Sequence, residues 1–224
     1  MKKLFLYLFL LVSAGEVIST LVEAPMLHTI CKPALMIILA LYYWAEQKSH
    51  QESVSGVVIL AILFSGAGDI LLMFQQREPL LFMLGLLSFL VAHVFYIFAY
   101  RQHQQGDDSH ALYGLQKIRF SFPIVLAGLG LVTILYGHLG DLKIPVIVYA
   151  AVLVFMTLSA LYRFGRTSAS SFAMVFGGAI LFMMSDSLLA INKFLEPLPM
   201  EGFWIMSTYI SAQFLIVRGL LRHH

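Results

Sequence analysis

Five ionisable side chains lie inside otherwise apolar stretches of the sequence, and they are its first candidates for chemistry. They are Glu16, Lys32, Asp69, His93 and Asp186. Ionisable groups are costly within hydrocarbon, so their presence there indicates a function. Two carboxylates in one low-dielectric cleft cannot both ionise cheaply, and one of them keeps its proton. Asp69 and Asp186 would therefore provide an acid and a base at neutral pH without a metal.

A purely structural role for these residues is the alternative interpretation. Asp69, Asp186 and Lys32 could form a buried ion-pair network that fixes how the helices pack. The surroundings of His93 favour a packed, hydrogen-bonded histidine over a reactive one, because its helix face is aromatic. That face carries Phe89, Tyr96 and Tyr100.

The composition indicates that these residues are positioned by helices in a membrane. Of the 224 residues, 60% are hydrophobic and 12% are charged, whereas soluble domains carry roughly 25% charged residues. So few charges could not cover the surface of a soluble fold of this size. The sequence therefore predicts an all-α, polytopic transmembrane bundle that forms one integral membrane domain over residues 1–224.

Eight segments are long and apolar enough for transmembrane helices, which need ~20 such residues. They run approximately over Leu4–Val22, Thr29–Trp44, Ser55–Phe74, Leu80–Tyr100, Phe120–His138, Ile144–Tyr162, Ser170–Asn192 and Gly202–Leu221. The second segment is short, so its helix is expected to tilt little or to begin near Met26.

The first segment has a second interpretation as a signal peptide, because Lys2 and Lys3 precede an apolar run. No A-x-A site follows, however, and polar residues at helical spacing continue along one face of the segment. These residues are Ser13, Glu16, Thr20 and Glu23. A discarded leader has no need of such a stripe, in which Glu16 could extend to the membrane surface beside Glu23.

The lysines and arginines of the connecting loops predict the orientation. If the N-terminus faces inside, ten of them lie on the inner side: Lys2, Lys3, Lys48, Arg101, Lys117, Arg119, Arg163, Arg166, Arg218 and Arg222. Three lie on the outer side: Arg77, Lys143 and Lys193. Both termini are therefore expected to face the cytoplasm, in the inner (cell) membrane if the protein is bacterial.

The depths of the candidate residues also agree. At ~1.5 Å per residue, Asp69 and Asp186 lie roughly 18–24 Å from the inner edge of a ~30 Å core. Lys32 and Tyr149 lie at a similar level, which predicts one cleft that a lipid can reach. A shift of 117 residues carries Asp69 onto Asp186 and Lys32 onto Tyr149, which hints at a weak four-plus-four internal repeat.

Several other functions are excluded. A scattered net charge of +2 forms no surface for nucleic acid. Cys31 is the single cysteine, which excludes an internal disulfide and a cysteine-based metal cluster. The sequence has neither an H-E-x-x-H nor a G-x-S-x-G motif. We therefore expect no metal and no cofactor.

Several segments, taken in order and at their spacing, carry a resemblance to a known family. They are Cys31–Met36, Leu63–Leu72, Leu84–Tyr96, Gly178–Ala190 and the end from Tyr209 through Gln213 to Arg218. Together they resemble the lysoplasmalogenase family, also called YhhN-like integral membrane proteins. Its members have eight spans, and the characterised ones hydrolyse the vinyl ether bond of lysoplasmalogens to a fatty aldehyde and a glycerophospho-ethanolamine or -choline. The resemblance places the family's acidic pair on Asp69 and Asp186, its lysine on Lys32 and its histidine on His93.

The resemblance implies a demand that two carboxylates can meet. Vinyl ether hydrolysis needs an acid that protonates the alkene carbon distal to oxygen, and a carboxylate that activates water and stabilises the cation. We expect Asp69 and Asp186 to fill these roles, in either order. Lys32 is expected to bind phosphate or to set the proton distribution of the pair, and Tyr149 and Tyr209 to orient water. The partners implied are a lysophospholipid substrate and membrane lipids.

Transport of a lipid, or proton-coupled transport, is the alternative function, because intramembrane carboxylates also relay protons. Transporters often interrupt helices with Gly or Pro at mid-membrane. Pro33, Pro123 and Pro145 are instead expected near helix starts, which favours a static scaffold around a site. A membrane structural protein with buried ion pairs is a third interpretation.

Overall fold

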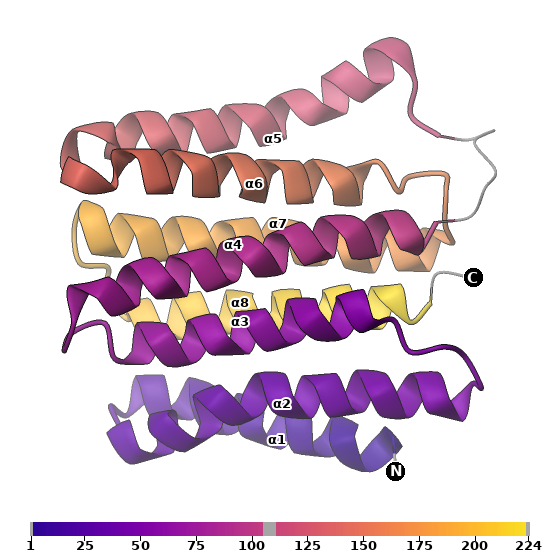
Figure 1. Ribbon diagram of the computed structural model, residues 1–224, viewed down its shortest axis with the longest axis horizontal. Helices are drawn as coiled ribbons and strands as arrows, with labels where there is room; N and C mark the ends of the chain where they lie inside the picture. Colours follow the sequence, from indigo (N-terminus) through magenta and orange to yellow (C-terminus); the bar gives the residue numbers. More distant parts are fainter. Residues whose placement is uncertain (1, 105–110, 223–224) are drawn as a thin grey trace. The chain divides into compact units, whose positions relative to one another are not determined.

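The computed structural model describes residues 2–104 and 111–222, and these form helices joined by short connections (Figure 1). Within the described residues, eight α-helices are long and apolar enough to cross a membrane. They are α1 (Lys2–Leu21), α2 (Pro25–Ser49), α3 (Gly56–Met73), α4 (Pro79–Gln102), α5 (Gly114–Leu135), α6 (Lys143–Leu161), α7 (Ala169–Phe194) and α8 (Glu201–Leu220). Two short 3-10 helices, η1 (Tyr136–His138) and η2 (Gly140–Leu142), join α5 to α6. The prediction of an all-α polytopic bundle is confirmed.

The chain divides into two compact units, Met1–Ala99 and Tyr100–His224. The first contains α1 to α3 and most of α4, and the second contains α5 to α8. A shift of 117 residues brings each helix of the first unit over one of the second: α1 over α5, α2 over α6, α3 over α7 and α4 over α8. This register is the one that the four-plus-four repeat requires.

Large apolar side chains face outward along these helices, most clearly on α5. Only Ile124, Gly128 and Leu135 of this helix are buried. Its outward-facing residues include Phe122, Leu126 and Leu129, each more than half exposed. Such a surface is unfavourable in water and suits the hydrocarbon of a bilayer, where each helix satisfies its own backbone hydrogen bonds.

Small residues allow close helix packing inside the first unit. A Cβ atom at Gly66 of α3 would lie 2.9 Å from Met36 of α2, and one at Gly68 would lie 2.5 Å from Phe89 of α4. The side chain of Ser88 on α4 donates to the carbonyl oxygen of Phe64 on α3 over 2.7 Å. The stretch of α3 that carries Asp69 is therefore held tightly between two neighbours.

In the second unit, small residues likewise allow α7 and α8 to pack closely. A Cβ atom at Gly178 would lie 2.9 Å from the carbonyl oxygen of Ala212, and one at Gly219 would lie 2.9 Å from the backbone nitrogen of Val175. Polar side chains add a further link, because Ser185 on α7 donates to the carbonyl oxygen of Ile205 on α8 over 3.1 Å. These contacts fix the α7 turn on which Asp186 lies.

Two of the three prolines lie inside helices, which corrects the expectation that all three are near helix starts. Both helices begin earlier than the apolar segments: α2 begins at Pro25 and α5 at Gly114. The reason is that hydropathy marks only the part of a helix in hydrocarbon, while polar turns at its end are helical too. Pro33 and Pro123 are consequently interior residues, and the proline argument against transport is lost.

Pro123 has a visible consequence for α5. Proline has no backbone N–H and its ring crowds the preceding turn, so a helix bends there. Figure 1 shows the N-terminal part of α5 turning away from α6. Pro145, in contrast, is the third residue of α6, where proline fits a helix without cost.

Candidate active site

Asp186 lies on α7 and is bonded to a tyrosine of the neighbouring helix. The hydroxyl of Tyr149 on α6 donates to Asp186 Oδ2 over 2.6 Å. Tyr149 is buried and Asp186 is half-buried. A short bond of this kind, from a hydroxyl to a carboxylate, is among the stronger hydrogen bonds in proteins. The structure thus brings together two of the predicted site residues.

The serines on either side of Asp186 are tied to backbone oxygens. Ser187 donates to the carbonyl oxygen of Met183 over 2.7 Å, and Ser185 to that of Ile205. Their hydroxyls are therefore engaged in helix packing and in local helix bonding. Among these three neighbours, the Asp186 carboxylate is the group that turns toward α6.

Asp69 lies on α3 in the first unit, in a more enclosed place. Its side chain is 3% exposed, and Ser65, one turn earlier on the same helix face, is fully buried. Ser65 donates to the carbonyl oxygen of Ala61 over 2.9 Å. The adjacent Gly66 and Gly68 admit α2 and α4 to within contact of the α3 backbone, so Asp69 lies in a closely packed part of this unit.

Lys32, on α2 of the same unit, is half-buried. Across residues 2–104 and 111–222 it makes no ion pair or hydrogen bond with a described partner. Its neighbour Cys31 is buried and packs against Gly15 of α1. Lys32 therefore places an ammonium group within the spanning region without a described carboxylate beside it.

His93 and Tyr209 are both buried. His93 on α4 is fully enclosed, as are Tyr96 and Tyr100 of its aromatic face. Tyr209 on α8 packs edge-on against Phe182 of α7, with ring centroids 5.5 Å apart, and accepts a hydrogen bond from Gln213 Nε2 over 3.4 Å. Phe182 lies one helical turn before Asp186, so Tyr209 belongs to the same region of the second unit.

The predicted site residues are thus divided between the two units. Lys32, Asp69 and His93 belong to the first, while Tyr149, Asp186 and Tyr209 belong to the second. Within the second unit the structure joins Tyr149 to Asp186. The convergence of Asp69 with Asp186 in one cleft stays a prediction.

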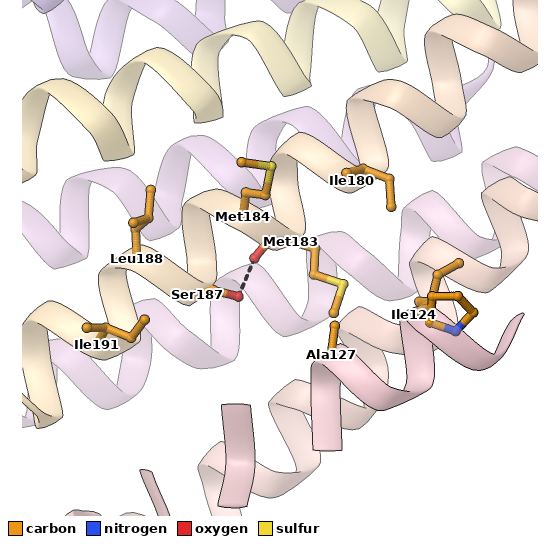
Figure 2. A pocket seen from close by; sticks show the side chains of 9 residues that line it. Ile124, Ala127, Ile180, Met183, Met184, Ser187, Leu188 and Ile191 are labelled. Atoms are coloured by element: carbon orange, nitrogen blue, oxygen red, sulfur yellow. Dashed lines mark hydrogen bonds between the residues drawn. The ribbon is translucent and has the colours of Figure 1, made fainter. Parts of the chain in front are cut away.

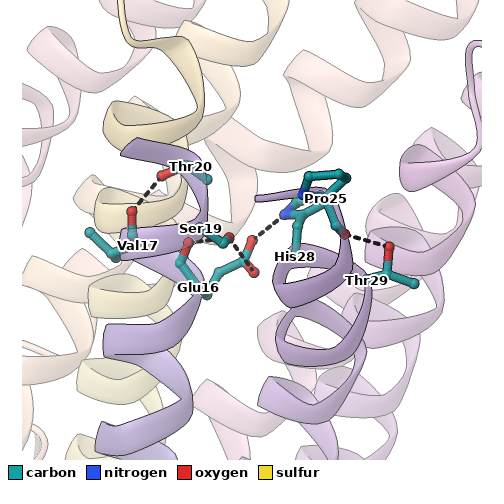
Figure 3. A network of polar contacts seen from close by, with 7 residues as sticks. All are labelled: Glu16, Val17, Ser19, Thr20, Pro25, His28 and Thr29. Atoms are coloured by element: carbon teal, nitrogen blue, oxygen red, sulfur yellow. Dashed lines mark hydrogen bonds and ion pairs between the residues drawn. The ribbon is translucent and has the colours of Figure 1, made fainter. Parts of the chain in front are cut away.

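Glu16 of α1 is a further buried acid, which the sequence analysis expected to extend to the membrane surface. Its side chain is fully buried, and its Oε1 lies 2.8 Å from Nδ1 of His28 on α2 (Figure 3). Ser19 lies within 3.5 Å of the other carboxylate oxygen. Glu16 therefore does not extend to the membrane surface. A signal for this pair was present, since both residues lie near the short turn that joins α1 to α2.

A second polar cluster involves Arg163, which sequence analysis treated only as an inner-loop charge. It follows α6 and is fully buried. Its Nη2 donates to the carbonyl oxygen of His103 over 2.9 Å and to Ser171 Oγ over 3.0 Å. Ser171 in turn donates to the carbonyl oxygen of Gly219. Burial lowers the pKa of Arg163 to about 10, so it stays a cation that links the end of α4 to α7 and α8.

No group of three or more His, Cys, Asp or Glu side chains within 2–104 and 111–222 could hold a metal ion. What the described residues offer is carboxylates, a lysine and hydroxyls, which are suited to proton transfer and to binding an anion.

The fold and these residues define a polytopic membrane protein with acids and bases inside its spanning helices. A family model described as the YhhN family matches residues 27–220, and the chain belongs to that family.

Several curated proteins are similar to this chain. The human protein named Lysoplasmalogenase TMEM86A is 33% identical over 171 residues, which make up 71% of this chain and 62% of that protein. Lysoplasmalogenase TMEM86B of Sus scrofa is 30% identical over 189 residues, 83% of this chain and 71% of the relative. A protein named Lysoplasmalogenase of Mycobacterium tuberculosis is 29% identical over 199 residues, 86% of this chain and 71% of the relative.

The match spans less than two thirds of the human TMEM86A sequence. No solved structure matches the chain.

Proposed function

We propose that this protein is a membrane-embedded hydrolase that cleaves the vinyl ether bond of lysoplasmalogens. The observation that carries the proposal is the similarity, over most of the chain, to proteins from mammals and mycobacteria that are named lysoplasmalogenase. The carboxylates within the spanning helices support it, because the reaction needs an acid and a base in contact with a lipid. The products are a fatty aldehyde and a glycerophospho-ethanolamine or -choline.

The reaction begins with a proton transfer to carbon. A carboxylic acid gives its proton to the alkene carbon distal to the ether oxygen, and the adjacent carbon becomes part of an oxocarbenium ion. Water attacks this carbon as a carboxylate accepts one of its protons, which forms a hemiacetal. The carboxylate left by the first proton transfer then accepts the hydroxyl proton of the hemiacetal. The glycerol oxygen leaves with the proton that the other carboxyl group took from water, so both groups return to their starting states.

In this proposal the two aspartates have different tasks. Tyr149 donates a hydrogen bond to Asp186, and a donor of this kind stabilises the ionised form of a carboxylate. Asp186 therefore serves as the carboxylate that activates water and stabilises the cation. Asp69 is more enclosed and serves as the acid. Their convergence in one cleft is part of the proposal.

Lys32 binds the phosphate of the lysolipid in the same proposal. Its ammonium group has no described carboxylate beside it, and the depth that the sequence predicts is close to the headgroup region. Tyr209 orients water in the second unit, and His93 is assigned a packing role because it is fully enclosed.

The decisive experiment mixes the purified protein with a vinyl-ether lysolipid and follows aldehyde release. The saturated-ether analogue of the same lysolipid is the matched control, since it has no alkene carbon to protonate. In D₂O, the aldehyde should carry deuterium on the carbon next to the carbonyl. Absence of aldehyde from the vinyl-ether substrate at any pH would overturn the proposal.

The proposal includes an orientation, with both termini in the cytoplasm, because of the excess of lysine and arginine in the predicted inner loops. Reporter fusions after Arg222 should be active on the cytoplasmic side, and fusions near Arg77 and Lys193 on the opposite side. A C-terminal fusion that reports the outer side would contradict the orientation.

Lipid or proton-coupled transport stays the second candidate function, because Pro33 and Pro123 lie inside helices and such prolines can serve moving elements. The two candidates differ in a sealed vesicle. A transporter moves intact lysolipid across the bilayer without aldehyde release, whereas the hydrolase produces aldehyde in detergent, where no gradient exists.

A further inference from the structure

We propose that a groove between α5 and α7 holds the alkenyl chain of the lysoplasmalogen substrate. This inference rests on the proposed function and deepens it. The groove has a volume of about 380 Å³, which falls in the range of ligand sites, about 300–1,000 Å³. Figure 2 shows Ile124 and Ala127 of α5 facing Ile180 and Met183 of α7 across it.

The lining of the groove fits hydrocarbon. Of its described lining residues, only Ser187 carries a polar side chain, and that hydroxyl donates to the carbonyl oxygen of Met183 in its own helix. Two methionines, Met183 and Met184, contribute flexible side chains that adapt to a chain without a fixed shape. A polar or charged ligand would find no matching groups here, so the occupant is an alkyl or alkenyl chain.

The groove runs along the stretch of α7 that carries the proposed catalytic carboxylate, although Asp186 itself is turned toward α6 and does not line it. Ser187 follows Asp186 in the chain, and Met183 precedes it by nearly one turn. Met183 also reaches α6, where Thr157 Oγ1 lies 4.0 Å from its sulfur, and α6 is the helix that carries Tyr149. The wall of the groove and the bonded Tyr149–Asp186 pair therefore belong to the same packed region of the second unit.

The direction of the groove fits the two ends of the substrate. Its α7 residues extend from Ile180 to Ile191, roughly 16 Å along the helix at ~1.5 Å per residue. Asp186 lies between these ends. Ile191 is close to the end of α7, where a headgroup would meet water, and Ile180 is close to the middle of the helix, where a tail would lie. A lysolipid along α7 would thus place its ether linkage at the level of Asp186 along the helix axis.

The groove acts through alignment and not through hydrophobic affinity. A lysolipid tail already lies in hydrocarbon, so its transfer from bilayer to groove removes little surface from water. A chain held along α7 instead restrains the alkene carbons beside the carboxylate, and misplacement by about 1 Å can cost 10²-fold in rate. The groove should therefore raise kcat/KM for substrates with long chains and have little effect on kcat/KM for substrates with short chains.

The test compares Ala127→Phe, which fills the groove, with Leu126→Phe, which adds an aromatic ring to the adjacent lipid-facing residue. Aldehyde release is measured with a long-chain lysoplasmalogen and with a short-chain analogue whose tail ends before the level of Ala127. We expect Ala127→Phe to lower kcat/KM about tenfold or more for the long chain, and to leave the short chain within about twofold. Leu126→Phe should change neither value. An equal loss on both substrates, or no loss on either, would overturn the proposal.

A binding measurement separates this proposal from the proposed function. A long-chain lysolipid with a photoreactive group in its tail should label α5 and the Ile180–Ile191 stretch of α7, and excess lysolipid should compete while diacyl phospholipid should not. Such labelling without aldehyde release would leave the groove in place and remove the hydrolase. Labelling that diacyl phospholipid suppresses equally would show bulk bilayer lipid only, and the groove proposal would fall even if aldehyde is released.

Discussion

The two aspartates lie at corresponding places in the two units but in different surroundings. A shift of 117 residues carries Asp69 onto Asp186 and Lys32 onto Tyr149. In the second unit, Tyr149 donates to Asp186 over 2.6 Å, and an apolar groove lies alongside. In the first unit, Asp69 is 3% exposed beside glycines packed against α2 and α4, and Lys32 has no described carboxylate next to it.

This difference shows how two units whose helices share a register can provide unlike chemical groups. The helix register is shared, but the corresponding position in the neighbouring helix holds an ammonium group in one unit and a hydroxyl in the other. Tyr149 gives Asp186 a hydrogen-bond donor in its own unit, whereas Lys32 is proposed to bind the phosphate of the ligand. Catalysis by this protein, as proposed above, depends on that asymmetry.

The largest effect is expected for the aspartates themselves. Asp69→Asn and Asp186→Asn should each lower aldehyde release by ~10²–10⁴-fold, because an amide can neither deliver the proton nor accept one. The double variant should be hardly worse than either single variant, because the two residues act as a unit. Asp141→Asn, in the exposed η2 turn, is the control and should retain full activity.

Thermal melting in detergent separates catalysis from architecture for the same variants. A buried amide finds hydrogen bonds more cheaply than a buried charge, so both Asn variants should melt close to the unmodified protein. A large loss of stability with retained aldehyde release would favour the ion-pair interpretation of these residues. Well-folded variants that release aldehyde at the normal rate would remove both aspartates from the mechanism.

Tyr149→Phe should have the next largest effect. A hydrogen bond to a charged group contributes ~1.5–3 kcal/mol, so activity should fall by roughly tenfold or more. The loss should appear mainly in kcat, because the bond positions the carboxylate that accepts the proton from water. Tyr162→Phe is the matched control, because it removes a hydroxyl bonded to Ser121 at the other end of α6. Unchanged kcat in Tyr149→Phe would contradict the role given to this bond.

Lys32→Met tests whether the Lys32 ammonium group binds the phosphate of the lysolipid. The expected result is a rise of about tenfold in KM with kcat nearly unchanged, since loss of a binding contact present in both ground and transition state has this signature. The control is Lys143→Met. Lys143 is the first residue of α6, and its ammonium group lies over the ring of Tyr136 in η1. A fall in kcat at constant KM would instead indicate that Lys32 sets the protonation of the carboxylates.

The sequence predicted the elements better than their polar contacts, for a physical reason. Hydropathy located every span, because hydrocarbon tolerates only long apolar helices. The shortness of the second segment also indicated a start near Met26, next to the observed Pro25, but the polar first turns of α5 were missed. Shared depth and the 117-residue shift placed Tyr149 with Asp186, and the structure joins them. The Glu16–His28 pair depends on how α1 and α2 pack, and the buried position of Arg163 depends on the packing of α4, α7 and α8. For the Glu16–His28 pair the signal was limited to the closeness of both residues to the α1–α2 turn, and the burial of Arg163 has no local sequence signature.

Glu16→Gln should have the smallest effect on activity, and it sharpens the comparison between the two units. Glu16 is a fully buried carboxylate of the first unit, as enclosed as Asp69, but its partner is His28. If burial alone made a carboxylate catalytic, this variant would lose activity, whereas the proposed assignment predicts turnover within about twofold of normal.

The stability of Glu16→Gln should change by about 1 kcal/mol, because the amide keeps hydrogen-bonding capacity. His28→Ala should cost more, about 1–3 kcal/mol, since it leaves a buried acceptor without its donor. Melting curves and aldehyde release measured side by side distinguish the two outcomes, and a loss of activity in Glu16→Gln at unchanged stability would move Glu16 into the site.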